Sequence, residues 1–200
     1  MNLRKRLKNL AVRLFRPLLC SVAVVHISAC SSTVQWDEEV LLNDGRKIVV
    51  TQVRRCEGGN AHAKIGASCV MRDAWATFRL PEFSNQEIVW HESLNPMILN
   101  TSKGRLYIVG FPTHTLEFRA YGAKNPPYVG FLWDGGAFKR IAFTDIPIEI
   151  YATNMLIESV PEKRREFLTL QAKNAPDENG AETKPAYLHY VDPKFAMPEY

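Results

Sequence analysis

The stretch Val40-Leu41-Leu42-Asn43-Asp44-Gly45-Arg46-Lys47-Ile48-Val49-Val50 contains the clearest local signal of structure in the chain. Residues that favour β-strands lie on both sides of Asp44-Gly45, and a helix here would contain three poor helix formers in succession. Asp-Gly between two such runs is a strong hairpin signal, because a type I′ turn needs positive φ at both central residues. The stretch therefore predicts two adjacent antiparallel strands.

Similar patterns continue as far as about residue 150. A second hairpin is predicted over residues 128–143, with its turn at Asp134-Gly135-Gly136. Between the two hairpins, further strand candidates lie at residues 74–80, 87–91, 96–99, 106–109 and 115–121. We therefore expect a mainly β, antiparallel domain of about 7–9 strands, which forms either a sandwich or a single curled sheet.

The predicted β-rich globular domain spans residues 36–171, a length that one hydrophobic core can stabilise. Alternation along its strands predicts which side chains are buried. The expected core residues are Trp36, Val40, Leu42, Ile48, Val50, Phe78, Leu106, Ile108, Phe131, Trp133 and Ile141.

One or two short helices are expected, both toward the C-terminus. Ser159-Val160-Pro161-Glu162 is typical of a capping box and predicts a short helix that runs toward Gln171. Residues 144–157 are compatible with either a short helix or a strand. Residues 172–200 are polar and contain prolines, so we expect a poorly ordered tail. Four aromatic side chains of this tail could still dock on the domain: Tyr187, Tyr190, Phe195 and Tyr200.

The first thirty residues have a different character. Six basic residues occur there, no acidic residue precedes Asp37, and an apolar run covers residues 18–29. This run of about twelve residues is shorter than the roughly twenty that a membrane-spanning helix needs. A basic head followed by a short apolar run therefore predicts an export signal.

The end of the apolar run, Ile27-Ser28-Ala29-Cys30, resembles the lipobox of bacterial lipoproteins. The resemblance implies that residues 1–29 are a signal peptide, and that Cys30 carries a covalent lipid that anchors the protein in a membrane. Residues 30–35 would be the lipidated cysteine and a short tether that reaches at most roughly 17 Å. The serine that follows this cysteine resembles the residue found at that position in lipoproteins of the outer membrane. We therefore expect the protein at the outer membrane, facing the periplasm.

Two stretches of the mature part resemble an uncharacterised group of proteobacterial envelope lipoproteins. They are Trp36-Asp-Glu-Glu-Val-Leu-Leu-Asn-Asp-Gly-Arg46 and Pro126-Pro-Tyr-Val-Gly-Phe-Leu-Trp-Asp-Gly-Gly136. Because that group has no assigned activity, the resemblance implies no catalytic residue.

The net charge of +4 is misleading, because it depends on the leader. Without the six basic residues of the leader, nineteen basic residues remain against 21 acidic ones. The mature chain therefore has a slight negative charge and offers no support for nucleic-acid binding, which favours a basic surface.

Cys56 and Cys69 are the only mature cysteines besides Cys30. Export places them in an oxidising compartment, so we expect a disulfide that closes the glycine-rich loop between them, worth roughly 3 kcal/mol. A metal site built from Cys56, His62 and Cys69 is the alternative, but it lacks a fourth ligand at a usual spacing. We therefore expect no metal.

No catalytic motif is complete. His91-Glu92-Ser93-Leu94-Asn95 begins like the zincin motif but ends in asparagine, and no G-x-S-x-G, P-loop or G-x-G-x-x-G sequence occurs. The acidic cluster Asp37-Glu38-Glu39 and the pair Arg54-Arg55 are interpreted as solvated surface residues. We expect no catalytic residue and no cofactor other than the lipid.

These observations favour a non-catalytic envelope module that binds another protein or contributes to an envelope assembly. Two alternatives stay open: an enzyme that acts on an envelope polymer, and a binder of small ligands that uses the aromatic residues within 121–133. A deep pocket with two convergent carboxylates or a Ser–His pair would favour the enzyme, whereas an exposed apolar patch would favour the protein-binding module.

The lipid anchor leads to the first prediction. Cys30→Ala should abolish both metabolic labelling with palmitate and removal of the leader, because the thiol is the acceptor of the lipid. Normal processing and membrane association of the alanine variant would contradict the interpretation.

Overall fold

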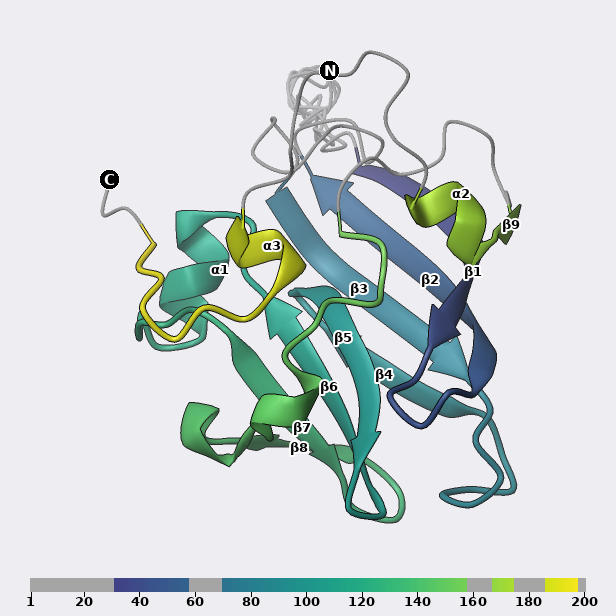
Figure 1. Cartoon of the computed structure of the whole chain (residues 1–200). Coiled ribbons are helices and arrows are strands. Elements are labelled where there is room, and N and C mark those ends of the chain that lie inside the picture. Colours follow the sequence, from purple (N-terminus) through teal and green to yellow (C-terminus); the bar gives the residue numbers. More distant parts are fainter. Residues whose placement is uncertain (1–30, 58–69, 158–166, 175–185, 198–200) are drawn as a thin grey trace, which may run out of the picture.

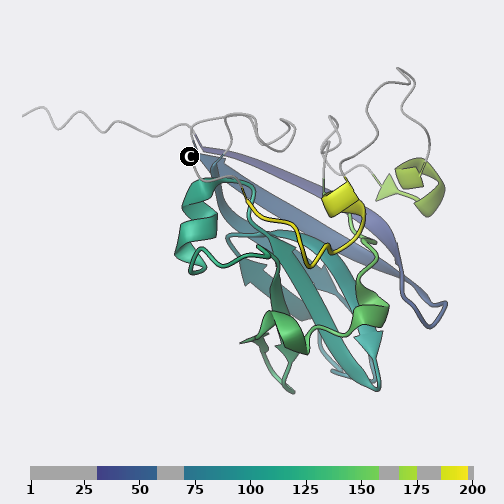
Figure 2. The same ribbon diagram turned by 60° about the vertical axis from the view of Figure 1, so that its left-hand side comes forward.

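The structure is a computed structural model that describes residues 31–57, 70–157, 167–174 and 186–197. The strands are β1 (Ser31–Leu41), β2 (Lys47–Glu57), β3 (Val70–Phe78), β4 (Ile88–Glu92), β5 (Asn95–Ser102), β6 (Arg105–Phe111), β7 (Val129–Trp133), β8 (Phe138–Ile141) and β9 (Phe167–Leu168). They form a five-stranded sheet of order β4-β3-β2-β1-β9 and a four-stranded sheet of order β5-β6-β7-β8. The two sheets pack against each other, so the mainly β prediction is confirmed as a sandwich (Figures 1 and 2).

Both predicted hairpins are present. β1 and β2 pair in antiparallel register from Ser31 opposite Glu57 to Leu41 opposite Lys47. β7 and β8 pair in the same manner, and Trp133 lies opposite Phe138 across the glycine turn. Local turn chemistry was therefore sufficient to locate these strands.

The first turn differs in its details from the predicted type I′ turn. Five residues connect β1 and β2, and among them only Gly45 has positive φ, at 86°. The Gly45 N–H donates to the Leu42 carbonyl at 3.0 Å, and the Leu42 N–H donates to the Arg46 carbonyl at 2.8 Å. A longer loop with a single left-handed glycine closes the hairpin equally well, because only one residue then needs positive φ.

The strand predicted at residues 115–121 is wrong, because Thr115–Ala120 forms helix α1. The carboxylate of Glu117 accepts hydrogen bonds from the backbone N–H groups of Thr113, at 2.8 Å, and His114, at 2.6 Å. These bonds satisfy donors that a helix start leaves free, so they favour a helix in a sequence with β-forming residues.

The C-terminal part also departs from expectation. Residues 159–166, where the helix was predicted to begin, lie outside the described residues. Phe167 and Leu168, which were expected to be helical, form β9, which pairs in parallel with β1. Helix α2 then covers Leu170–Asn174. Residues 144–157, predicted as either a short helix or a strand, hold part of one 3-10 helix (Phe143–Asp145) and all of a second (Ile148–Ile150).

The poorly ordered tail predicted for residues 172–200 is wrong for residues 172–174, which belong to α2, and for residues 186–197. This segment includes helix α3 (Ala186–His189), and Leu188 and Val191 are buried in the core. Tyr190 makes an isolated β-bridge with Ala152, and Phe195 packs against the same core cluster. The few apolar side chains of the segment therefore outweigh its polar composition, because they cover the second sheet.

The expected tether also has a defined structure. Ser31–Gln35 belong to β1 and pair with β2 as far as Glu57. Residues 31–35 are therefore part of the sheet, where the sequence predicted a short tether.

The core agrees with the alternation of the strands. Eight of the eleven predicted core residues are buried, while Ile48, Trp133 and Ile141 are partly buried at its margin. Among the described residues, no helix is long and apolar enough to span a membrane.

A close approach on β7 generates the second prediction. A Cβ on Gly130 would lie 2.6 Å from Ile146 Cγ1 and 2.9 Å from Ile141 Cγ1. Gly130→Ala should therefore lower the free energy of unfolding by about 1–3 kcal/mol, measured by urea denaturation. Gly136→Ala is the control, since nothing lies within 4 Å of its added Cβ. Equal stability of the two variants would contradict this account.

Candidate functional site

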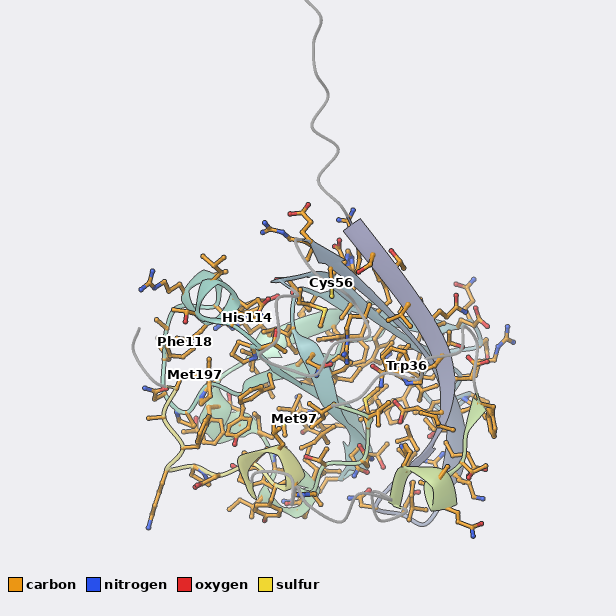
Figure 3. The ribbon with its side chains drawn as sticks, turned by 90° about the horizontal axis from the view of Figure 1, so that it is seen from above. Trp36, Cys56, Met97, His114, Phe118 and Met197 are labelled. Atoms are coloured by element: carbon orange, nitrogen blue, oxygen red, sulfur yellow. The ribbon has the colours of Figure 1, made fainter. Side chains whose placement is uncertain are left out.

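A group of polar side chains lies buried between the sheets, on the inner face of the five-stranded sheet. Glu38, Gln52 and Arg54 expose 0%, 1% and 3% of their surface. Strand alternation explains their direction, because Glu38 shares a face of β1 with Trp36 and Val40. Figure 3 shows Trp36 on the side of β1 that faces the second sheet. The interpretation of Glu38 and Arg54 as solvated residues is therefore wrong.

The carboxylate of Glu38 joins three segments of the chain. It accepts a hydrogen bond from Gln52 Nε2 on β2, and the Leu156 N–H donates to its two oxygens at 3.1 and 3.0 Å. Lys173 Nζ of α2 lies 2.6 Å from Glu38 Oε2 and also donates to the Asn154 carbonyl at 2.8 Å. Both charged side chains are buried, at 0% exposure for Glu38 and 8% for Lys173. Such a pair needs all its hydrogen bonds, because desolvation of both ions is costly.

The guanidinium of Arg54 occupies the adjacent part of the network. It donates to Asn95 Oδ1 at 2.6 Å, and its carbon lies 5.2 Å from the centroid of the Trp36 ring. Burial lowers the pKa of Arg54 to about 10, an effect that the negative charge of Glu38 partly offsets, so the side chain stays charged at neutral pH. Arg54 Nε and Trp36 Nε1 are buried donors without a hydrogen-bond partner in the described part of the chain.

Asn154 connects the two sheets directly. Its Oδ1 accepts from the Leu99 N–H at 3.0 Å, and its Nδ2 donates to the Leu99 carbonyl at 2.8 Å and to the Leu41 carbonyl at 2.9 Å. Leu99 lies on β5 of the second sheet and Leu41 at the end of β1. This side chain therefore acts as a substitute for strand pairing at the edge of β5.

The opposite surface of the five-stranded sheet, which we call the outer face, carries the side chains of β1–β4 that point away from the second sheet. Leu41, Val49 and Val89 are about half exposed there, at 46%, 52% and 49%. Trp75 stacks on His91 with ring centroids 4.5 Å apart and an interplanar angle of 7°. These side chains belong to all four long strands of the sheet, so the face combines aliphatic and aromatic groups.

Charged pairs accompany the aromatic stack on the outer face. Asp73 accepts from His91 Nε2 at 2.8 Å and from Arg55 Nε at 2.6 Å. Burial raises the pKa of Asp73, but the hydrogen bonds from His91 and Arg55 outweigh this effect and leave the pKa below its usual value. Asp73 is therefore a fixed negative charge between two donors.

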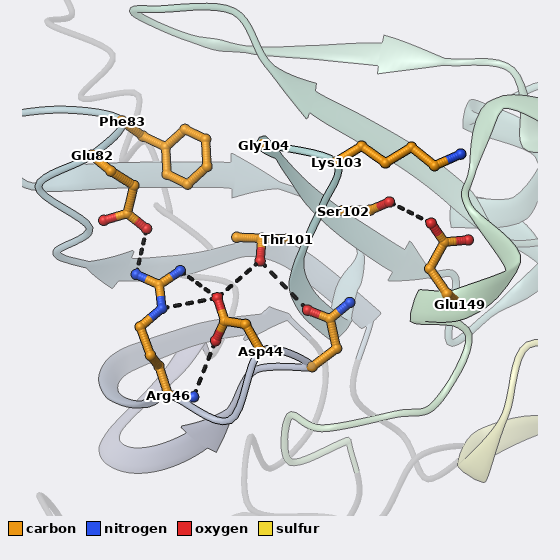
Figure 4. A pocket seen from close by; sticks show the side chains of 10 residues that line it. Asp44, Arg46, Glu82, Phe83, Thr101, Ser102, Lys103, Gly104 and Glu149 are labelled. Atoms are coloured by element: carbon orange, nitrogen blue, oxygen red, sulfur yellow. Dashed lines mark hydrogen bonds and ion pairs between the residues drawn. The ribbon is translucent and has the colours of Figure 1, made fainter.

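A polar hollow of about 380 Å³ lies at the end of the sandwich formed by the β1–β2 and β5–β6 turns (Figure 4). Arg46 binds Asp44 at 2.6 Å and Glu82 at 2.5 Å, and Ser102 Oγ donates to Glu149 at 2.6 Å. The hydrogen bond from Arg46 lowers the pKa of Asp44. Asp44 and Glu82 are both bound by the same guanidinium, which is the arrangement of an ion-pair network. The residues that line this hollow include no histidine.

The aromatic stretch proposed for small ligands is divided between different environments. Tyr121 OH donates to Glu92 at 2.6 Å, and burial together with this hydrogen bond raises the pKa of Tyr121 to about 12. Phe131 is buried in the core, where it packs edge-on against Trp90, and Trp133 packs against Phe138. The contacts of Phe131 and Trp133 are those of a hydrophobic core, whereas Tyr121 is held by a hydrogen bond to a carboxylate.

The predicted site residues are only partly described. Cys56 is wholly buried beside Val34 and Trp36, whereas Cys30, His62 and Cys69 lie outside the described residues. The disulfide and the lipid attachment therefore stay predictions. In the described ranges, no three His, Cys, Asp or Glu side chains are grouped in a way that could hold a metal ion.

Sequence reasoning missed the buried network, although a signal was present. Glu38 and Arg54 occupy inward positions in the strict alternation of β1 and β2, so this pattern alone places them in the core. Lys173 could not be found in this manner, because 135 positions separate it from Glu38.

Comparison with known proteins gives no relative. No protein-family model, no curated protein and no solved structure matches this chain significantly.

The third prediction concerns Asn154. Asn154→Ala should lower the free energy of unfolding by about 2–3 kcal/mol, because the buried N–H and carbonyl groups of Leu99 lose their partner. Chemical denaturation measures the effect, and Asn85→Ala in the exposed loop before β4 is the control. A loss no larger than that of the control would show that the side chain does not join the sheets.

Proposed function

We propose that the mature protein is a non-catalytic envelope module that is anchored through a lipid on Cys30 and binds a protein partner through its outer face. The observation that carries the proposal is the set of exposed apolar side chains on that face, Leu41, Val49 and Val89, together with the stacked Trp75. Exposed apolar groups on a single face of a folded domain are typical of interaction surfaces.

The arrangement of the outer face supports a protein partner. Protein interfaces commonly combine an aromatic centre with a polar rim. Here Trp75 stacks on His91 of β4 and lies opposite Val53 of β2, and Asp73 and Arg55 form an ion pair on the same face. Charged side chains elsewhere in the described structure form ion pairs within the protein: Glu38 pairs with Lys173, and Arg46 pairs with Asp44 and Glu82.

The start of β1 supports anchoring close to a membrane. Because this strand begins at Ser31, a lipid on Cys30 would hold one end of the five-stranded sheet at the membrane surface. The β1–β2 turn would then lie roughly 35 Å away along the strand. We propose the outer membrane, on its periplasmic side, as the location.

The same compartment favours a disulfide between Cys56 and Cys69. Its formation is part of the proposal, and the burial of Cys56 at the end of β2 agrees with a structural role. Mass spectrometry of the mature protein without reductant should detect the two cysteines in one linked peptide, whereas two alkylated thiols would rule out the disulfide.

A pull-down from the native membranes tests the fourth prediction, partner binding. Lipidated wild-type protein should recover a specific partner after cross-linking, and a Val49→Lys, Val89→Lys double variant should recover about tenfold less, since two buried charges would disrupt an apolar interface. The matched control is Leu116→Lys with Ile148→Lys, because these aliphatic side chains are also exposed, at 58% and 71%, but lie on α1 and the second 3-10 turn.

Circular dichroism should give the same spectrum for all three proteins. Equal recovery by the outer-face variant and the control would show that the partner uses another surface. Absence of any specific partner would remove the protein-binding function itself.

A further inference from the structure

We propose that the Glu38 carboxylate and the Asn154 carbonyl, which bind the ammonium of Lys173, form a recognition site for a lysine-bearing segment of a partner protein. The segment of residues 167–174, which comprises β9 and α2 and which we call the strap, occupies this site in the isolated chain. The proposal goes beyond the outer-face interaction, because it concerns a different side of the five-stranded sheet.

These two acceptors have the chemistry of an ammonium site. Lys173 Nζ lies 2.6 Å from Glu38 Oε2 and 2.8 Å from the Asn154 carbonyl oxygen. A carboxylate and a carbonyl together accept two of the three protons of an ammonium and neutralise its charge. Because Glu38 is fully buried, a neutral side chain at the same place would remove the positive charge that compensates this carboxylate, so the site discriminates in favour of a cation.

The accepting groups do not depend on the strap for their position. Gln52 Nε2 and the Leu156 N–H hold the Glu38 carboxylate from β2 and from the segment before residue 158. Asn154 is held in turn by the backbone of Leu99. The site is therefore organised before any lysine enters, which lowers the entropic cost of binding.

The strap itself is attached through few interactions. β9 pairs with β1 only at Asp37 and Glu38, and the Leu170 N–H donates to Glu39 at 2.9 Å. In the described strap, only Leu168, Leu170 and Lys173 are partly buried, and Phe167 is 49% exposed. In its described residues the strap is held by Leu168, which packs against the cluster of Val34, Trp36 and Cys56, and by the buried ion pair of Lys173. A second lysine can compete for this ion pair.

The attachment of the strap also defines the kind of partner. β9 adds to the edge of β1 in parallel orientation, and the lysine follows six positions after Phe167 on a short helix. A competing segment therefore needs an extended stretch that pairs with β1, followed by one helical turn that carries a lysine. Strand addition of this kind is a common mode of peptide recognition, in which pockets for side chains provide the specificity.

The test uses the mature chain with Lys173→Ala and a fluorescent peptide with the strap sequence Phe-Leu-Thr-Leu-Gln-Ala-Lys-Asn. By fluorescence anisotropy, the peptide should bind this variant at least about tenfold more tightly than it binds the wild type, whose own lysine competes. A peptide with norleucine in place of lysine should bind about tenfold more weakly. Lys139→Ala is the control, because it removes an exposed lysine that pairs with Asp134.

Hydrogen exchange of the wild type supplies a second measurement that does not depend on the folding of the variant. The Leu170 amide should exchange at least about tenfold faster than the Leu99 amide, because the strap opens without global unfolding. Equal exchange of the two amides would overturn the proposal, as would equal binding of the lysine and norleucine peptides, or no binding to the Lys173→Ala variant. An unfolded Lys173→Ala variant would also overturn it, since the strap would then be an inseparable part of the fold.

Discussion

The buried carboxylate of Glu38 is the constraint on which the arrangement of this sandwich depends. A negative charge that is removed from water needs donors on several sides, and within the body of the sandwich they come from Gln52 on β2 and from the Leu156 N–H, while Lys173 of the strap adds a positive charge. The chain positions of these donors span more than half of the protein, so the need to satisfy one side chain brings distant segments together. The apolar core supplies the driving force for packing, whereas this network determines which segments close the sandwich.

The features that the sequence predicted correctly depend on local chemistry. Asp44-Gly45 and Asp134-Gly135-Gly136 define hairpins because a glycine that adopts positive φ permits a tight turn between β-forming runs. Alternation then identified most of the core, including Trp36 and Phe131. These signals operate over a few residues, so no knowledge of the tertiary structure is needed to use them.

The errors arise where a distant or polar contact decides the structure. Residues 115–120 contain β-forming side chains, but Glu117 is buried, accepts from the Met71 N–H of β3 at 2.9 Å, and stabilises the start of a helix. Burial raises the pKa of this carboxyl, and the surrounding donors oppose that effect. The placement of Lys173 beside Glu38 is likewise a property of the assembled fold. The tail prediction was based on the polar composition of residues 172–200, although a few apolar side chains dock residues 186–197 on the core.

The position of β1 has a mechanical consequence for an anchored protein. If Cys30 carries the anchor, a load between the membrane and a bound partner enters the domain at Ser31 and runs along the strand axis. β1 is paired with β2 over its whole length, from Ser31 opposite Glu57 to Leu41 opposite Lys47. Tension along the strand therefore acts in shear on all of these backbone hydrogen bonds together, whereas a pull perpendicular to the strand would break them one after another. The geometry places the most extensive strand pairing of the fold directly in the path of the force.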